Sequence, residues 1–143
     1  MNDLGPRIVV AEDVVRCTNT LHQMRFSPEL THDDRLTLSL SMISSFGQLA
    51  AERVGRSYGG GLLKFELVDA RRFPILLRKS GPAEATFAKA DSAIRAGALH
   101  RARRIADELL LPLIFGSSWE HAASEMMEEV SQMRAVRRLN AKS

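Results

Sequence analysis

The sequence predicts an α+β protein, with a small mixed strand and helix region over residues 1–79 and a three-helix region over residues 80–143. Short β-branched and alternating apolar runs in the first region favour strands. After Pro82 the composition becomes rich in alanine, and Gly97 and Pro112 divide the remaining chain into helical segments. The predicted strands are too few for a doubly wound parallel sheet.

The first region is predicted to begin with extended chain and to continue as one long helix. Residues 6–26 contain short β-branched runs, which are typical of strands. Thr31 or Asp33 can cap a helix that runs to about Val54 with its leucines on one face. Gly55 is placed to end this helix.

A loop and two extended segments complete the first region. Residues 56–61 form a glycine-rich loop. In residues 62–67, apolar side chains alternate with Lys64 and Glu66, which indicates a half-buried strand. Residues 72–77 are predicted to be a second extended segment.

The second region is predicted to be a helical hairpin followed by a long helix. Residues 82–96 and 98–111 form the hairpin, and a last helix runs from Ser117, which has a capping-box pattern with Glu120, to about Leu139. The residues expected to close the hairpin are Ile94, Leu99, Ala102, Ile105, Ala106 and Leu109. The apolar stripe of the last helix is Trp119, Met126, Val130 and Met133. Either the hairpin or a partner chain must cover this stripe, so a homo-oligomer through the last helix is an open alternative.

Composition indicates a soluble, cytoplasmic protein and excludes several kinds of site. The 143 residues include one cysteine, Cys17, so there is no internal disulfide, and a small buried thiol is expected. No apolar run is long enough to cross a membrane. No histidine pair has the helical spacing of a zinc site, and no nucleophile elbow occurs. The sequence therefore predicts neither a metal site nor catalytic residues.

Positive charge and three consecutive glycines point to a polyanionic ligand. The net charge is +3, and arginine, which suits phosphate and guanine edges, supplies most of the 20 positive residues. Gly59–Gly61 are the one feature that composition does not explain, because glycine runs are used where backbone must turn or approach a surface closely. Arg53, Arg56 and Lys64 flank them, so the loop can cradle a phosphate or a base edge. A plain hairpin bend is the alternative.

A wider set of residues resembles a known family. Residues 16–26 precede the predicted helix, Gly55 to Glu66 come after it, and Arg72-Phe73-Pro74-Ile75 close the segment. This arrangement, over roughly residues 7–77, is similar to the C-terminal region of adenine-specific (N6) DNA methyltransferases of prokaryotic restriction–modification systems. The most specific stretch is Arg53 to Glu66. The resemblance implies a part that engages DNA beside a catalytic domain, which transfers a methyl group from S-adenosylmethionine to adenine N6.

The sequence departs from that family in its catalytic parts. No proline is followed by a second proline, so the Asp/Asn/Ser-Pro-Pro-Tyr/Phe turn is absent, and no glycine-rich cofactor loop comes after a strand. With so few strands, the chain holds no complete methyltransferase fold. We therefore expect a non-catalytic DNA-recognition fragment or subunit that grips duplex DNA for a separate catalytic subunit, which would bind the cofactor.

Two alternatives stay open. Whether the chain is part of an enzyme is not decided by the sequence. The chain could instead be a helical protein-interaction module with only an ancestral likeness to the methyltransferases and no DNA binding of its own.

Side chains that can reach phosphates or base edges give the candidate site. The predicted DNA-binding residues are Arg16, Asn19, Thr20, His22, Arg25, Arg53, Arg56, Ser57, Tyr58, Gly59, Gly60, Gly61 and Lys64. A second basic face consists of Arg95, Arg101, Arg103 and Arg104. This second face either extends the DNA-facing surface or is an ordinary solvated helix face.

Overall fold

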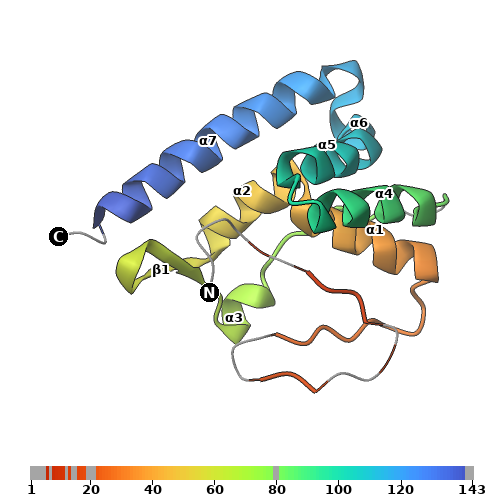
Figure 1. Cartoon of the computed structure of the whole chain (residues 1–143), viewed down its shortest axis with the longest axis horizontal. Coiled ribbons are helices and arrows are strands. Elements are labelled where there is room, and N and C mark those ends of the chain that lie inside the picture. Colours follow the sequence, from red (N-terminus) through yellow and green to blue (C-terminus); the bar gives the residue numbers. More distant parts are fainter. Residues whose placement is uncertain are drawn as a thin grey trace.

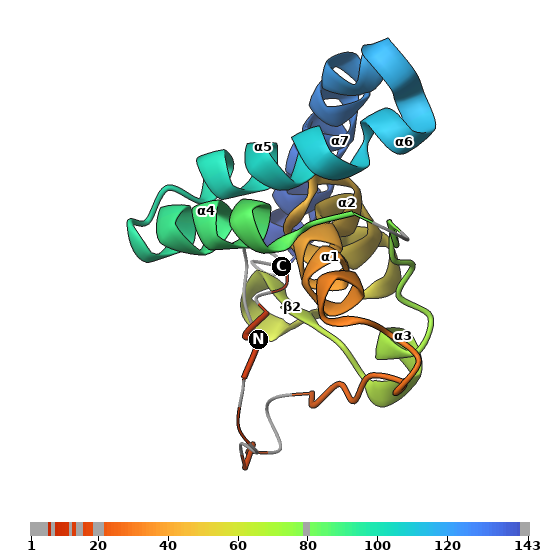
Figure 2. The same cartoon turned by 90° about the vertical axis from the view of Figure 1, so that its right-hand side faces the viewer.

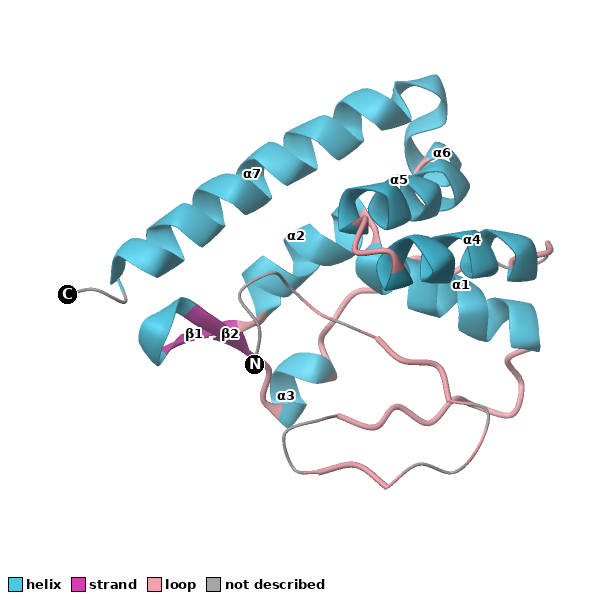
Figure 3. Cartoon of the chain, in the orientation of Figure 1, coloured by secondary structure: helices cyan, strands magenta, loops and turns pink. Residues whose placement is uncertain are grey.

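The computed structural model describes residues 6, 8–11, 13, 16–18, 22–78 and 81–140 and shows a mainly helical molecule with one small antiparallel hairpin (Figures 1 and 3). The elements are α1 (His32–Ile43), α2 (Ser45–Val54), β1 (Arg56–Tyr58), the 3-10 turn η1 (Gly59–Gly61), β2 (Leu62–Lys64), α3 (Leu67–Ala70), α4 (Glu84–Arg95), α5 (Leu99–Leu110), α6 (Pro112–Phe115), η2 (Gly116–Ser118) and α7 (Trp119–Asn140). The predicted α+β class is confirmed, with the strands in the first half and a helical second half.

The predicted long helix is two helices that meet at Ser44. Thr31 caps α1 as expected: its hydroxyl accepts from the Asp34 N–H at 3.1 Å, and the Asp34 carboxylate accepts from the Thr31 N–H at 2.9 Å. Ser44 ends α1 and caps α2, because its hydroxyl oxygen accepts from the Gly47 N–H at 3.1 Å. Gly55 ends α2, as the sequence predicts.

A carboxylate far away in the sequence fixes this break. The side chain of Asp107, from α5, accepts from the backbone N–H of Ser45 at 2.7 Å and from its hydroxyl at 2.6 Å. Asp107 is buried, and burial raises the pKa of its carboxyl, although the hydrogen bonds from Ser45 oppose the shift. The start of α2 is thus satisfied by a group that no local pattern reveals.

The hairpin of α4 and α5 packs on α1 through small side chains. Leu40 of α1 shares one core with Ala90, Ala93, Ala102, Ala106 and Leu110. Alanines at the contact let the helices approach closely. Ile94 and Leu99, which were expected to close the hairpin, are instead 37% and 45% exposed, because they lie at its turn beside Gly97.

The last helix packs mainly along α2 (Figures 1 and 2). Val130 is fully buried, and the other stripe residues, Trp119, Met126 and Met133, are half-buried. Within the chain, α2 rather than the helical hairpin thus provides most of the cover of this stripe, and a homo-oligomer through the last helix stays a prediction. The helix begins at Trp119, and Ser117 lies in η2 before it.

The expected extended segments are largely wrong, because a strand needs a partner. The described part of residues 6–26 contains no strand, and residues 73–78 are irregular. The partner of β2 is instead the polar segment Arg56–Tyr58, predicted as loop, which the glycine turn folds back so that Tyr58 pairs with Leu62. Leu67 begins α3 rather than ending a strand.

Both predicted regions contribute to the core around Leu40, and the boundary between residues 1–79 and 80–143 stays a prediction. No helix in the described ranges is both long and apolar enough to cross a membrane.

Candidate nucleic-acid interface

The tip of the β-hairpin is an open turn of bare backbone. Gly60 and Gly61 have φ angles of +77° and +72°, which non-glycine residues rarely adopt. Gly59 and Gly60 are exposed, and a Cβ added at either would meet nothing within 4 Å. Only Gly61 is buried. The space that a side chain would occupy at the first two glycines is thus open.

The base of this turn is held by α7. Arg137 donates from Nη1 to the carbonyl oxygen of Gly61 and, from Nε and Nη2, to the carboxylate of Glu52 at 3.1 Å. Arg134 donates to the same carboxylate at 2.9 Å and to the side-chain oxygen of Gln48 at 2.8 Å. We call Gln48, Glu52, Arg134 and Arg137 the buried clamp. The sequence analysis missed it, although Arg137 falls four residues after Met133 on the predicted apolar stripe, where an arginine is unexpected.

Each cation predicted around the loop has a carboxylate partner. The pairs are Arg53 with Glu129 at 2.6 Å, Arg56 with Asp69 at 2.8 Å, and Lys64 with Glu66 at 2.7 Å. Hydrogen bonding to Arg56 lowers the pKa of the Asp69 carboxyl, and the Lys64 ammonium lowers the pKa of the Glu66 carboxyl. These cations must therefore exchange a carboxylate for any phosphate they bind.

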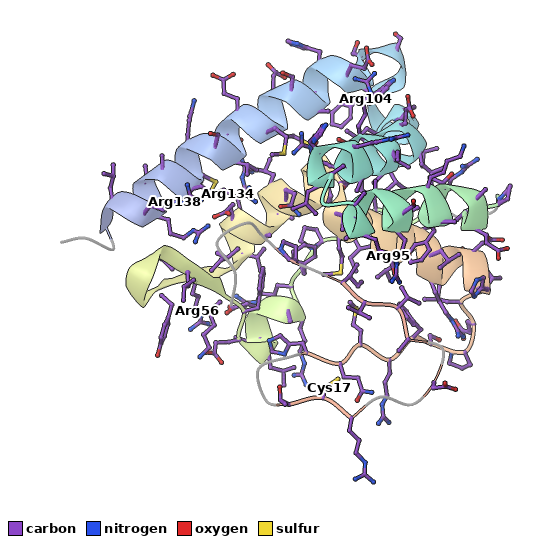
Figure 4. All side chains as sticks on the ribbon, viewed as in Figure 1. Cys17, Arg56, Arg95, Arg104, Arg134 and Arg138 are labelled. Atoms are coloured by element: carbon purple, nitrogen blue, oxygen red, sulfur yellow. The ribbon has the colours of Figure 1, made fainter. Side chains whose placement is uncertain are left out.

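Tyr58 presents an aromatic ring beside the glycine turn. Its side chain is 55% exposed, and the Lys64 ammonium lies 5.1 Å from the ring centroid. Ser57 is exposed as well, next to Arg56, whose guanidinium lies on the α3 side of the hairpin (Figure 4). An exposed aromatic ring next to positive charge is the combination that stacks on nucleobases.

The structure describes some of the predicted DNA-binding residues that precede α1. The ring of His22 lies 2.8 Å, through Nε2, from the carbonyl oxygen of Phe65, which brings it to the end of the hairpin. Arg16 and Arg25 are exposed, whereas Asn19 and Thr20 lie outside the described residues. Cys17 is exposed (Figure 4), so the expected buried thiol is wrong.

Two further cations, which the sequence analysis did not name as site residues, come after α3. Arg71 and Arg72 are both exposed and lie two and three residues after Asp69, the partner of Arg56. Neither forms a salt bridge with a described residue. Two adjacent arginines after the predicted strand are the sequence feature by which they could have been found. They add positive charge outside the salt bridges, and the charge of Arg72 also helps to lower the pKa of the Asp69 carboxyl.

The second basic face lies elsewhere. Arg95 pairs with Asp91 at 2.7 Å, and Arg104 pairs with Glu120 at 2.7 Å and stacks over Trp119. The remaining members are Arg101, which is exposed, and Arg103, which is half-buried and favours the charged form of Asp107. Figure 4 shows Arg95 and Arg104 well apart from Arg56. The structure thus does not bring the two basic sets together.

The glycine turn does not have the arrangement of a cofactor-binding loop. The glycine turn joins two strands of a hairpin, whereas a cofactor loop comes after a strand and opens a helix. The described part of the chain also brings together no group of three metal-ligating side chains.

One family model matches the greater part of the chain. Residues 1–111 match the family model described as type II methyltransferase M.Eco57I, C-terminal domain. The match includes the glycine turn and continues through α5, beyond the residues that carry the resemblance in the sequence, and it stops before α6. No curated protein and no solved structure gives a significant match. Since the match covers most of its length, the chain belongs to the family of C-terminal domains of type II restriction–modification methyltransferases.

Proposed function

We propose that this chain is a DNA-recognition part of an adenine-specific (N6) DNA methyltransferase and grips duplex DNA for a separate catalytic part. Family membership supports a role in such an enzyme. The observation that carries the DNA-binding role is the open glycine turn, whose first two residues have free space where a side chain would lie. S-adenosylmethionine, the methyl donor, is bound by the catalytic part.

The proposed role rests on the chemistry of base methylation. An enzyme that modifies a base must take it out of the stack, so part of the protein must hold the flanking duplex. A turn without side chains lets backbone N–H groups come within hydrogen-bond distance of a phosphate. In the proposed complex, Gly59 and Gly60 make this approach, and Tyr58 stacks on a base beside it.

The charges around the turn fit the same role. The side chain of Arg56 is 58% exposed, so a phosphate can reach its guanidinium, although its partner Asp69 is buried. Lys64 and Glu66 form a pair that is open to solvent, so a phosphate can replace the carboxylate at small cost. Arg71 and Arg72 bind phosphate directly, while His22 and the exposed arginines before α1 extend the surface.

Titration of a DNA duplex with the purified chain over about 50 to 200 mM salt tests this proposal. Each phosphate contact made by a cation steepens the log–log salt dependence by about 0.9, so the double variant Arg71→Gln/Arg72→Gln should lower the slope by about 1.8. Lys89→Gln removes an exposed charge from α4 and is the matched control, with the slope unchanged. Absence of duplex binding at the lowest salt, or an unchanged slope in the double variant, contradicts the proposal.

Exposed apolar residues favour a second candidate, a protein-interaction module. Leu113 and Ile114 of α6 are 58% and 55% exposed, and Val136 and Leu139 of α7 are 55% and 67% exposed. Such residues suit docking to a protein, including a second copy of this chain. A stable homodimer in sedimentation, together with no duplex binding, would support this candidate over the first.

A further inference from the structure

We infer that Arg137 is a positioning residue that holds the glycine turn in the conformation used to bind DNA, an inference that rests on the proposed function. It makes α7, which lies outside the family match over residues 1–111, a working part of the DNA-binding unit.

The Arg137 guanidinium donates hydrogen bonds to two different groups. Its side chain is 6% exposed, and it donates to the Gly61 carbonyl from one terminal nitrogen and to Glu52 from Nε and the other. A planar group with several donors in a fixed geometry can join a carbonyl and a carboxylate in this way, whereas a lysine ammonium is a single point of charge. The contact is therefore specific to arginine.

The partner carboxylate is itself fixed. Glu52 is 2% exposed in its side chain and accepts from Arg134, which is 15% exposed and also donates to Gln48 of α2. A buried carboxylate with several charge-assisted hydrogen bonds has little freedom to move. The buried clamp thus ties the Gly61 carbonyl to α2 through α7.

Little else on this side of the hairpin immobilises the turn. An open groove of about 560 Å³ runs between the hairpin and α7, lined by residues that include Ser57, Leu63, Met133 and Val136. The hairpin is therefore not packed tightly against α7 along its length. The hydrogen bond from Arg137 is a polar link that crosses from α7 to the turn.

Holding Gly61 should matter because three glycines in a row are otherwise very mobile. Glycine loses more conformational entropy on ordering than other residues. If the turn is already ordered at Gly61, less entropy is lost when Gly59 and Gly60 meet a phosphate, and binding is tighter. The clamp leaves these two glycines open while fixing the residue that comes after them.

The test compares Arg137→Met with Val130→Ala, at a temperature where all variants are folded. Val130 is fully buried on the same helix, so Val130→Ala weakens α7 packing but leaves the clamp in place. Amide exchange of Gly60, Gly61 and Leu62, followed by NMR, should be at least about tenfold faster in Arg137→Met than in Val130→Ala. Duplex affinity should fall about tenfold in Arg137→Met and stay near wild type in Val130→Ala. Arg137→Lys should behave like Arg137→Met.

The outcomes separate the inference from the function on which it rests. Equal exchange in the turn of Arg137→Met and Val130→Ala would overturn the inference, since Arg137 would then be merely structural. A salt slope lower by about 0.9 in Arg137→Met would also overturn it, because Arg137 would itself contact a phosphate. If the wild-type chain binds no duplex, the proposed function fails, whereas the exchange measurement still decides whether the clamp orders the turn.

Discussion

Gly47 and Gly59 both lie near the start of a helical turn, yet their surroundings are opposite. A Cβ on Gly47 would collide with the carbonyl oxygen of Ser41 and lie 2.6 Å from that of Met42, whereas a Cβ on Gly59 would meet nothing within 4 Å. Packing of α2 against the end of α1 thus explains Gly47, and nothing inside the described chain explains Gly59. A glycine that is required neither by packing nor by backbone conformation within the chain points to a contact with another molecule.

The charged groups of the helical body, where α2 packs against α7, and those at the tip of the β-hairpin differ in the same way. In the body, Glu52 is buried with two arginines, so its interactions serve stability. At the hairpin, the side chains of Arg56 and Lys64 are 58% and 37% exposed, so a phosphate can reach both cations. Substitutions in the body should therefore lower stability, whereas those at the tip should change binding without lowering stability.

The largest loss of stability is expected for Glu52→Ala. Removing one member of a buried ion pair leaves the others uncompensated, which costs about 3 kcal/mol or more. Urea denaturation should show a correspondingly lower free energy of unfolding. The control is Glu129→Gln, which breaks the exposed pair with Arg53 and should have little effect. If the two variants were equally stable, the clamp would not be a stabilising part of the body.

The next largest effect is expected for Gly47→Ala, which should lower the free energy of unfolding by about 2 kcal/mol. The added methyl group would meet backbone carbonyls, which cannot move aside as a flexible side chain does. Thermal unfolding should show a melting temperature lower by several degrees. An unchanged melting temperature would mean that α1 and α2 are less closely packed than described.

A smaller, pH-dependent effect is expected at Asp107. Burial raises its pKa in the folded chain, so its contribution to stability is greatest when it is protonated and declines as the pH rises through that raised pKa. The stability of the wild type relative to Asp107→Asn should therefore fall as the pH rises above the ordinary carboxyl pKa of about 4. Asp69, whose pKa Arg56 lowers, should show the opposite sign against Asp69→Asn, with stability lost as the pH falls. Denaturant unfolding at several pH values measures both, and a relative stability of Asp107→Asn that is independent of pH would contradict the first.

The smallest effect on stability is expected for Gly59→Ala. The added methyl group has open space, and the φ angle of Gly59 does not lie in the left-handed region. The free energy of unfolding should stay within about 0.5 kcal/mol of wild type. A larger loss in denaturant unfolding would show that the tip has an internal constraint after all.

Helix ends could be predicted from the sequence where a local group sets them. Thr31, Gly55 and Gly97 act within a few residues of the boundaries they fix, so their residue types are informative. The break at Ser44 could not be predicted, because it depends on Asp107 and the apolar periodicity continues through it. Likewise β1 owes its conformation to its partner strand, whereas the β-branched runs of residues 6–26 have none in the described chain.

The backbone turn of the candidate site could be predicted from the sequence, whereas the partners of its charged side chains could not. Consecutive glycines indicate an unusual turn wherever they occur, and the structure shows one. The partners of Arg53, Arg56 and Lys64 could not be assigned from the sequence, since Glu129 comes from a helix 76 residues away and Asp69 is brought close by the fold of α3. The contact of Arg137 with the turn could not be predicted for the same reason, because its carbonyl partner lies in another element.

The central claim is that the glycine turn has a reason outside the chain, namely contact with DNA. It is tested most directly by comparing the duplex affinity of Gly59→Ala with that of the wild type at one low salt concentration, after both are shown to be equally stable. We expect binding about tenfold weaker or more, because the methyl group would lie where the phosphate backbone approaches. Equal affinity of the two proteins would contradict the claim.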